Sequence, residues 1–180
     1  MTPEEIIDFW FSETVQAYWF RSTPEFDREL GSRFGAAWEL ARDGRLADWE
    51  QTAEGALALV LLLDQFPLNM FRDRPEGFST EAESRAVAGR AIMRGLDVSL
   101  PDTGKAFMYL PYMHSESLAD QDRSVELFRL AGLDDNLKWA RHHREIVRRF
   151  GRFPHRNAIL GRASTPEEME WLASPEGFNP

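Results

Sequence analysis

The segment HSESLADQD, residues 114–122, gathers the side chains of this chain that are best suited to proton transfer. Histidine has the ordinary pKa closest to neutral pH, and burial or a charged neighbour can move the pKa of a carboxyl group toward the same range. If the protein is an enzyme, we expect His114 to act as one acid–base group and Glu116 or Asp120 to act as the other. Such a pair would make the protein a hydrolase or a transferase, which is one of the functions that the sequence leaves open.

A strongly basic segment follows at residues 138–162, with the sequence KWARHHREIVRRFGRFPHRNAILGR. It holds eight Lys or Arg residues and a single acid, Glu145, so it carries a charge of +7 in a chain whose net charge is −9. The remaining residues must then carry −16. Three of the four histidines, His142, His143 and His155, also lie in this basic segment. A charge imbalance of this size has to be neutralised within the fold or by a bound anion.

Four arginines of the basic segment recur over two helical turns and a loop, namely Arg148, Arg149, Arg152 and Arg156. We expect the apolar residues between them to anchor the segment to a core and to hold the guanidinium groups at fixed positions. Fixed arginines bind carboxylate or phosphate groups through two parallel hydrogen bonds. The leading predicted function is therefore a binding module that accepts a small anionic ligand or an acidic peptide. The alternative is pairing within the chain, with the acids Asp64, Glu116, Asp120 and Asp122.

The spacing of the histidines gives metal chemistry little support. His142 and His143 are adjacent and so point to different faces of a helix, and no His-Glu-x-x-His or Glu-x-x-His pattern occurs. We predict no metal and no cofactor, and the alternative is a zinc site made by three histidines with Glu116 or Asp120. A nucleophilic serine beside His114 is not predicted either, because the Gly-x-Ser-x-Gly turn is absent.

The elements that must position these residues are helices. Capping boxes, in which a hydroxyl and a carboxylate satisfy the first backbone N–H groups of a helix, are predicted at Thr2, Thr80 and Thr165, each with a Glu three residues later. Glycines that can adopt a left-handed conformation follow several helical runs. No segment alternates apolar and polar residues for long enough to predict a strand. The predicted helices lie near residues 3–12, 24–43, 52–66, 80–94, 103–110, 112–131, 135–150 and 166–173.

Three of these helices place polar residues among apolar ones. The helix at 52–66 is apolar nearly all round and is expected to end at Pro67, which leaves Asp64 as a buried anion in need of a cationic or multi-donor partner. The basic segment is the natural source of that partner. If Pro111 opens the helix at 112–131, His114 and Gln121 share its apolar stripe. His143 lies in the apolar stripe of the next helix, together with Trp139, Ile146, Val147 and Phe150.

Composition sets the broad class of the protein. The chain has 180 residues, 43% of them hydrophobic, and a run of helices on short connections predicts a single all-α domain over residues 1–180 built from stacked antiparallel helical hairpins. The absence of cysteine excludes disulfides and thiolate chemistry. The longest uncharged run has nine residues, and the acidic start lacks the features of a targeting peptide, so we expect a cytoplasmic protein with no membrane partner. The net charge argues against nucleic-acid binding, whereas a protein partner and the oligomeric state stay open.

Four segments resemble one known family, the bacterial domain-of-unknown-function 924 family: DFWFSE, LLLDQFPLNMFR, YLPYMHSESLADQDRSVELF and HHREIVRRFGRFPHRNAILGRAST. The resemblance covers nearly the whole chain and implies a tetratricopeptide-like superhelical fold, but it brings no established reaction. It carries over the motif residues Asp64, Gln65, Asn69, His114, Ser115, Glu116, Asp120, Gln121, Arg149, Gly151, Arg152, His155, Arg156, Asn157 and Arg162. Members of the family usually have arginine where this chain has Leu68, and an anion site that used this arginine would be weaker here.

The residues and the resemblance together define one predicted site. Its acid–base residues would be His114, Glu116 and Asp120. Its ligand-binding residues would be Asp64, Gln65, Asn69, Gln121, His143, Arg149, Arg152, His155, Arg156 and Asn157. A third interpretation is that this cluster is a structural polar core and that the function lies on a surface that binds another protein.

Overall fold

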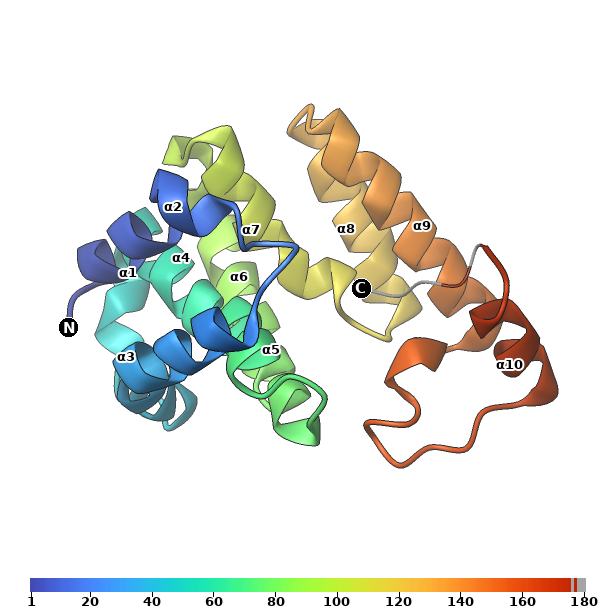
Figure 1. The fold of residues 1–180 in the computed structure, drawn as a ribbon. Helices are drawn as coiled ribbons and strands as arrows, with labels where there is room; N and C mark the ends of the chain where they lie inside the picture. Colours follow the sequence, from blue (N-terminus) through green and yellow to red (C-terminus); the bar gives the residue numbers. More distant parts are fainter. Residues whose placement is uncertain (176, 178–180) are drawn as a thin grey trace. The chain divides into compact units, whose positions relative to one another are not determined.

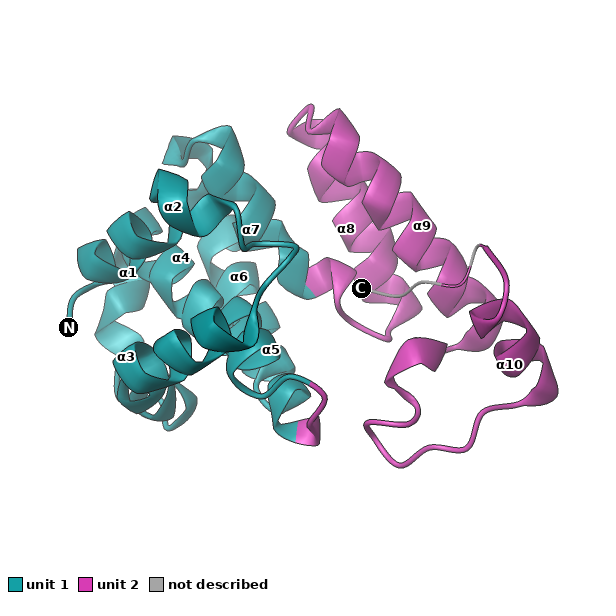
Figure 2. Ribbon diagram, viewed as in Figure 1, with its two compact units in different colours: residues 1–72, 76–111 teal, residues 73–75, 112–180 magenta. Residues whose placement is uncertain are grey.

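The computed structural model describes residues 1–175 and 177 of the chain, and these residues form helices, turns and loops without a strand (Figure 1). The prediction of an all-α protein is confirmed. The chain divides into two compact units, which Figure 2 distinguishes by colour: unit 1 is Met1–Arg72 with Glu76–Pro111, and unit 2 is Asp73–Pro75 with Tyr112–Pro180. The single domain and the tetratricopeptide-like superhelix remain predictions.

Unit 1 contains the helices α1 (Pro3–Trp10), α2 (Glu13–Gln16), α3 (Pro24–Arg42), α4 (Ala53–Val60), α5 (Phe66–Met70), α6 (Glu81–Met93) and most of α7 (Asp102–Met113). Short 3₁₀ turns join them at Ala47–Gln51 (η1), Pro75–Phe78 (η3) and Leu96–Ser99 (η4). The core lies around α4, which packs against α1 and α6. Because α4 is apolar on nearly every side, almost all of its residues are buried, as the sequence predicted.

Pro67 does not end the helix that contains Asp64, and this prediction is wrong. The chain widens into a π-helical turn at Leu61–Gln65 (η2) and then continues as α5. Proline has no N–H to donate and its ring clashes with the carbonyl four residues earlier, which here belongs to Leu63. The π-helical turn makes room for the ring, and the hydroxyl of Thr80 donates a hydrogen bond of 2.7 Å to the Leu63 carbonyl instead.

The same hydrogen bond explains why the predicted capping box at Thr80 does not form. The hydroxyl of Thr80 also lies 3.4 Å from the indole nitrogen of Trp38, and it makes no hydrogen bond to the first turn of α6. The capping boxes predicted at Thr2 and Thr165 are both present. The glycines that follow α3, α6, α8 and α9 have positive φ angles, as predicted: Gly44, Gly95, Gly132 and Gly151.

Unit 2 is built on an antiparallel hairpin of α8 (Leu118–Leu130) and α9 (Asp134–Phe150). A long turn that contains the 3₁₀ segment Pro154–Arg156 (η5) leads from α9 to α10 (Pro166–Leu172). The apolar side chains at the end of α9 pack with this turn and with α10 in a small core of Ile146, Val147, Phe153 and Trp171.

The predicted helix at 112–131 is not a single helix. Helix α7 runs through Pro111 to Met113, and α8 begins only at Leu118, where the side chain of Ser117 caps it. The amide of Gln121 donates 2.7 Å hydrogen bonds to the carbonyls of Met113 and Ser115. It thus supplies partners for two backbone carbonyls that the break between the helices would leave without one. His114 therefore lies in a loop, and the prediction that it shares a helix face with Gln121 is wrong.

Helix α9 confirms the burial predicted for His143, Ile146 and Val147. Trp139 is 55% exposed, however, and the stripe is completed by Leu137 and Ala140 instead. Within the described residues, no helix combines the length and the apolar character that a membrane crossing would need.

Candidate functional site

Three of the predicted site residues belong to unit 1 and form a short hydrogen-bonded chain along the helix. Asp64 is buried, with 1% of its surface exposed, and accepts a hydrogen bond of 2.6 Å from the amide of Gln65. Asn69 donates to the backbone carbonyl of Gln65 at 2.9 Å and accepts from Arg72 at 2.9 Å. The burial predicted for Asp64 is confirmed, and its pairing with the basic segment remains a prediction.

The remaining predicted residues all lie in unit 2, where the carboxylate of Glu116 holds the loop before α8 to the turn after α9. Both terminal nitrogens of Arg162 donate to this carboxylate, at 2.6 and 2.9 Å, and the backbone N–H of Phe153 donates to it at 2.8 Å. Burial raises the pKa of Glu116, but the hydrogen bonds from Arg162 and Phe153 lower it by more, so the net shift is downward. Glu116 is therefore an ionised anchor of the turn.

A second carboxylate, that of Glu168, fixes the other end of the same turn. It is only 2% exposed and accepts two hydrogen bonds from Arg152, at 2.7 and 2.8 Å, as well as one from the amide of Asn157 at 3.2 Å. The hydrogen bonds from Arg152 are the main reason why the pKa of Glu168 is lowered to about 2. Arg152 and Asn157 are thus brought together, although their common partner was not among the predicted residues.

Between these two anchors, the ring of Phe153 forms the centre of a cluster of polar groups. The ring is fully buried, and its centroid lies 5.5 Å from that of His143 and 5.6 Å from that of His155. The guanidinium carbon of Arg156 lies over the Phe153 ring, 4.7 Å from its centroid, and Arg156 is only 6% exposed. We call these four residues, Phe153, His143, His155 and Arg156, the Phe153 cluster.

The two imidazoles of the Phe153 cluster are neutral at physiological pH. Burial lowers the pKa of His143 to about 3, and burial together with the charge of Arg156 lowers the pKa of His155 to about 4. The Nδ1 atom of His143 lies 2.9 Å from the carbonyl oxygen of Trp139, which can only accept, so Nδ1 carries the proton. The Nε2 atom of His143 is then a hydrogen-bond acceptor.

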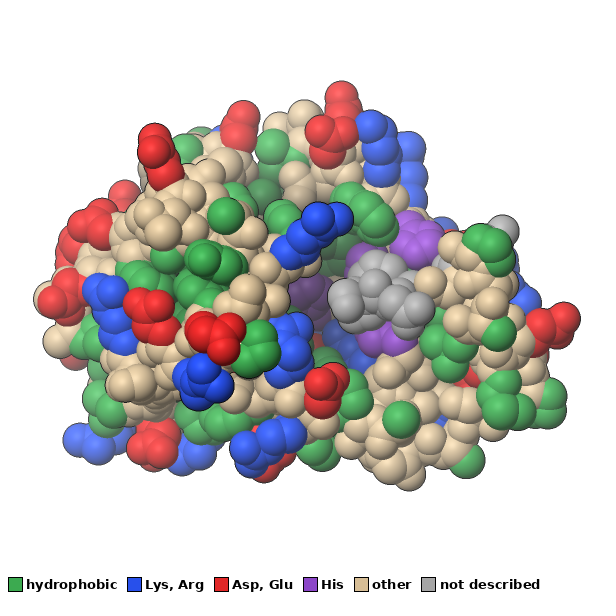
Figure 3. All heavy atoms as spheres, in the orientation of Figure 1, with side chains coloured by type: hydrophobic (Ala, Val, Ile, Leu, Met, Phe, Trp, Pro, Cys, Tyr) green, Lys and Arg blue, Asp and Glu red, His purple; other side chains and the backbone are tan. Residues whose placement is uncertain are grey.

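All four histidines of the chain belong to unit 2, and the histidine side chains visible in Figure 3 lie on that unit. His114, in the loop after α7, is near enough to lower the pKa of both His143 and His155 by electrostatic repulsion. Asp120, in the first turn of α8, accepts a hydrogen bond of 2.6 Å from the hydroxyl of Ser115. No three His, Cys, Asp or Glu side chains of the described residues meet in a way that would hold a metal ion.

Several arginines of the basic segment are paired on the surface instead of in this cluster. Arg149 donates to Glu167 at 2.9 Å, Arg148 to Glu145 at 2.5 and 2.7 Å, and Arg144 to Asp122. Pairing within the chain was one of the predicted outcomes for the arginines, but Glu167 and Glu168 were not among the expected partners. Arg149, predicted as a ligand-binding residue, is exposed and stacks over Phe150, so it lies outside the Phe153 cluster.

Sequence reasoning missed Phe153 and Glu168 as site residues, although the sequence carried a signal for each. Phe153 was interpreted only as an anchor for neighbouring arginines, and its ring is the surface on which the polar groups assemble. Glu168 was recognised only as the second half of a capping box. The carboxylate of Glu168 caps the helix and also binds Arg152, since it accepts a hydrogen bond of 2.8 Å from the N–H of Thr165 while it pairs with Arg152.

Residues 6–176 match the model of a family described as bacterial protein of unknown function, DUF924. The chain belongs to this family. A solved structure of a protein of unknown function from Agrobacterium tumefaciens, 42% identical in sequence, superimposes on it with a TM-score of 0.89 and covers 95% of this chain and 96% of its own. No curated protein matches the chain.

Membership of the DUF924 family and the similarity to the Agrobacterium protein agree with the all-helical fold of this chain. Neither relationship assigns a reaction or a ligand. Any function must therefore be argued from the groups that the fold brings together.

Proposed function

We propose that unit 2 is a binding module that accepts an anionic group, either a small carboxylate or phosphate ligand or the end of an acidic peptide, at the Phe153 cluster. Arg156 would supply the charge, and His155 and His143 would supply uncharged hydrogen-bonding groups. Arg152, Asn157 and Gln121 would serve the site indirectly, by fixing the backbone around it. The proposal includes the cytoplasmic location expected from the composition, and it does not require a metal or a cofactor.

The observation that carries this proposal is the buried guanidinium group of Arg156, which lies over the same Phe153 ring that His155 contacts. Burial is the largest cause of the lowered pKa of His155; the charges of Arg156 and Arg162 lower it further, and Glu116 opposes these two charges only in part. A potential that disfavours a proton on this ring favours an anion at the same place. Since the ring is largely buried, solvent screens this potential less than it would at the surface.

The geometry of the turn also favours recognition of a small group. The hydrogen bonds of Glu116 and Glu168 fix the backbone of the turn on both sides of Arg156. The ring of Phe153 packs against one face of the guanidinium group. A guanidinium group held in this way loses little side-chain freedom when it binds, so a larger part of the interaction energy contributes to affinity.

An enzyme that uses His114 with Glu116 or Asp120 is the other predicted function, and the geometry supports it less well. Glu116 is held ionised by three hydrogen bonds, and a general acid needs a pKa near the working pH. His143 and His155 are weak bases, with pKa values of about 3 and 4. The groups around His114 therefore favour binding over proton transfer.

A thermal-shift screen tests the proposal. Phosphate, nucleotides, small carboxylates and acidic peptides would be added to the wild type and to the Arg156→Lys variant, which keeps the charge but loses the two-pronged guanidinium geometry. A ligand at about a hundred times its dissociation constant adds about 2.7 kcal/mol, which raises the midpoint by about 5–10 °C in a chain of this length.

The matched control is Arg148→Lys, at an exposed position of the same basic segment. We expect one class of anion to stabilise the wild type and the control, and to stabilise Arg156→Lys by much less. Equal shifts in all three proteins would place the anion elsewhere. No shift with any anion would leave the cluster as a structural polar core and contradict the proposal.

A further inference from the structure

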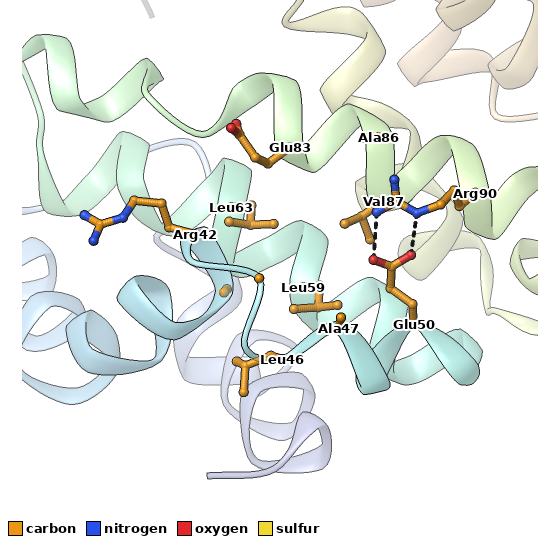
Figure 4. A pocket seen from close by; sticks show the side chains of 12 residues that line it. Arg42, Leu46, Ala47, Glu50, Leu59, Leu63, Glu83, Ala86, Val87 and Arg90 are labelled. Carbon is orange, nitrogen blue, oxygen red and sulfur yellow. Dashed lines mark hydrogen bonds and ion pairs between the residues drawn. The ribbon is translucent and has the colours of Figure 1, made fainter.

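Unit 1 contains a cavity of about 230 Å³ that none of the predicted site residues lines. Figure 4 shows it between the end of α3, the turn that follows, α4 and α6. Its walls include Leu59, Leu63 and Val87, whose side chains are at most 5% exposed. Apolar walls of this kind bind the hydrocarbon part of a ligand, and the volume is below the roughly 300 Å³ at which drug-sized sites begin. The cavity therefore suits a molecule of few carbon atoms.

Two of the charged residues around the cavity are a neutral pair. Arg90 donates two hydrogen bonds of 2.7 Å to the carboxylate of Glu50, and Figure 4 shows this pair at one side of the cavity. These hydrogen bonds raise the pKa of Arg90, so the guanidinium group stays charged and paired. Neither member of the pair gives the cavity a net charge.

Arg42 also lines the cavity, but its guanidinium group is directed away from it (Figure 4). The group donates to Asp43 at 3.0 Å and lies over the ring of Trp38, 5.0 Å from its centroid. Arg42 thus contributes mainly its aliphatic part to the cavity wall, and its charge is balanced by its neighbour in the sequence.

Glu83 is the remaining charged residue of the lining, and it sets the sign of the charge at the mouth. It is exposed, and no described residue pairs with its carboxylate through a hydrogen bond or an ion pair. The carboxyl end of α3, where the helix dipole is negative, lies at the same cavity through Ala41 and Arg42. The mouth therefore favours a cation, while the interior favours hydrocarbon.

We propose that this cavity binds a small aliphatic amine, with its hydrocarbon part against Leu59, Leu63 and Val87 and its ammonium group near Glu83. The proposal is independent of the function proposed for unit 2, because it rests on different residues in a different unit.

The test compares three probes of equal chain length, n-hexylamine, n-hexanol and n-hexanoate, by ¹H–¹³C NMR of the leucine and valine methyl groups in the full chain. We expect the amine to perturb the methyl groups of Leu59, Leu63 and Val87, and hexanoate to bind at least about tenfold more weakly. Glu83→Gln should weaken the amine about fivefold and leave hexanol unchanged. The control is Glu29→Gln, which removes the same charge at an exposed position of α3 outside the cavity lining. It should change the affinity for neither the amine nor hexanol.

A second variant tests the location of the site. Ala86 is an exposed cavity-lining residue of α6, and Ala86→Leu would fill the cavity, whereas Ala82→Leu adds the same bulk one turn earlier outside the lining. We expect only Ala86→Leu to abolish the perturbations. Hexanoate binding as tightly as hexylamine, amine binding that survives Ala86→Leu, or no perturbation by the amine at millimolar concentration would each overturn the proposal.

Discussion

The guanidinium group of Arg162 donates two hydrogen bonds to the carboxylate of Glu116, at 2.6 and 2.9 Å, across 46 residues of sequence. Both side chains are about one quarter exposed. The same carboxylate accepts the N–H of Phe153, while Arg162 also donates to the Phe153 carbonyl at 3.2 Å. The pair thus holds both backbone polar groups of the residue at the centre of the proposed site.

The first prediction concerns the stability contributed by this pair. We expect Glu116→Gln to lower the free energy of unfolding by about 1–3 kcal/mol, because a half-buried, charge-assisted pair lies between the values for surface and buried pairs. Urea denaturation measures this loss. The matched control is Glu145→Gln, which breaks the exposed pair with Arg148 and should cost less than about 1 kcal/mol. Equal losses in the two variants would show that the Glu116 pair does not organise the turn.

The second prediction is a loss of stability in mild acid that originates in two histidines. The folded-state pKa values of His143 and His155 are about 3 and about 4, whereas both histidines titrate near 6.5 in the unfolded chain. Between these values the unfolded state binds more protons, so the free energy of unfolding falls as the pH decreases from about 6.5. At pH 5 each histidine should cost about 2 kcal/mol relative to pH 8.

Denaturation of the wild type and of His155→Gln at pH 8, 6 and 5 checks this expectation. The variant should show about half of the acid-induced loss, because one of the two titrating groups is removed. The lowered pKa values of Glu116 and Glu168 contribute only when the pH falls below about 4.5, so they do not obscure this window. A flat profile between pH 6.5 and 5 in the wild type would contradict the burial of these imidazoles in a neutral state.

The third prediction concerns Asp64 in unit 1. Because this carboxylate is 1% exposed and is predicted to pair with the basic segment, we expect Asp64→Asn to cost about 3–5 kcal/mol, the usual loss when one partner of a buried charged pair is removed. Asp8→Asn, at an exposed position of α1, is the control and should change the stability by less than about 0.5 kcal/mol. A loss of under about 1 kcal/mol for Asp64→Asn would indicate that water reaches the carboxylate.

The fourth prediction contrasts two glycines in helices. A Cβ atom on Gly55 would lie 2.0 Å from the carbonyl oxygen of Trp49, so Gly55→Ala forces η1 and α4 apart and should cost about 3 kcal/mol or more. A Cβ atom on Gly31 meets nothing within 4 Å, and Gly31→Ala should raise the stability by up to about 1 kcal/mol. Thermal denaturation of both variants measures the difference, and a similar midpoint for the two would refute the close approach at Gly55.

Local signals in the sequence predicted the described helices other than α2 and α5, and most of their ends. The hydroxyls of Thr2 and Thr165 cap helices as expected, because a capping box needs only residues within one turn. The break between α7 and α8 was predicted at Pro111 but lies after Met113, since its position depends on how the side chain of Gln121 reaches back to two carbonyls. The continuation of the helix through Pro67 was missed for a similar reason, because the Leu63 carbonyl receives its hydrogen bond from Thr80, the residue before α6.

The composition of the candidate site was only partly predictable. The basic segment indicated where the arginines and histidines would gather, and His155 and Arg156 do meet at the same ring. The pairing of Arg152 with Glu168 was not predicted, because the two residues are 16 positions apart and meet only when the turn folds back. Charge patterns identify the groups that need partners, whereas the fold decides which partners they receive.

Isothermal titration calorimetry tests anion binding at the Phe153 cluster most directly. The anion that stabilises the protein most would be titrated into the wild type, Arg156→Ala and Arg148→Ala, with circular dichroism confirming that each variant is folded. We expect equal affinity for the wild type and Arg148→Ala, and a loss of at least about tenfold in Arg156→Ala, which corresponds to about 1.4 kcal/mol. Unchanged affinity in a folded Arg156→Ala protein would show that Arg156 does not bind the anion.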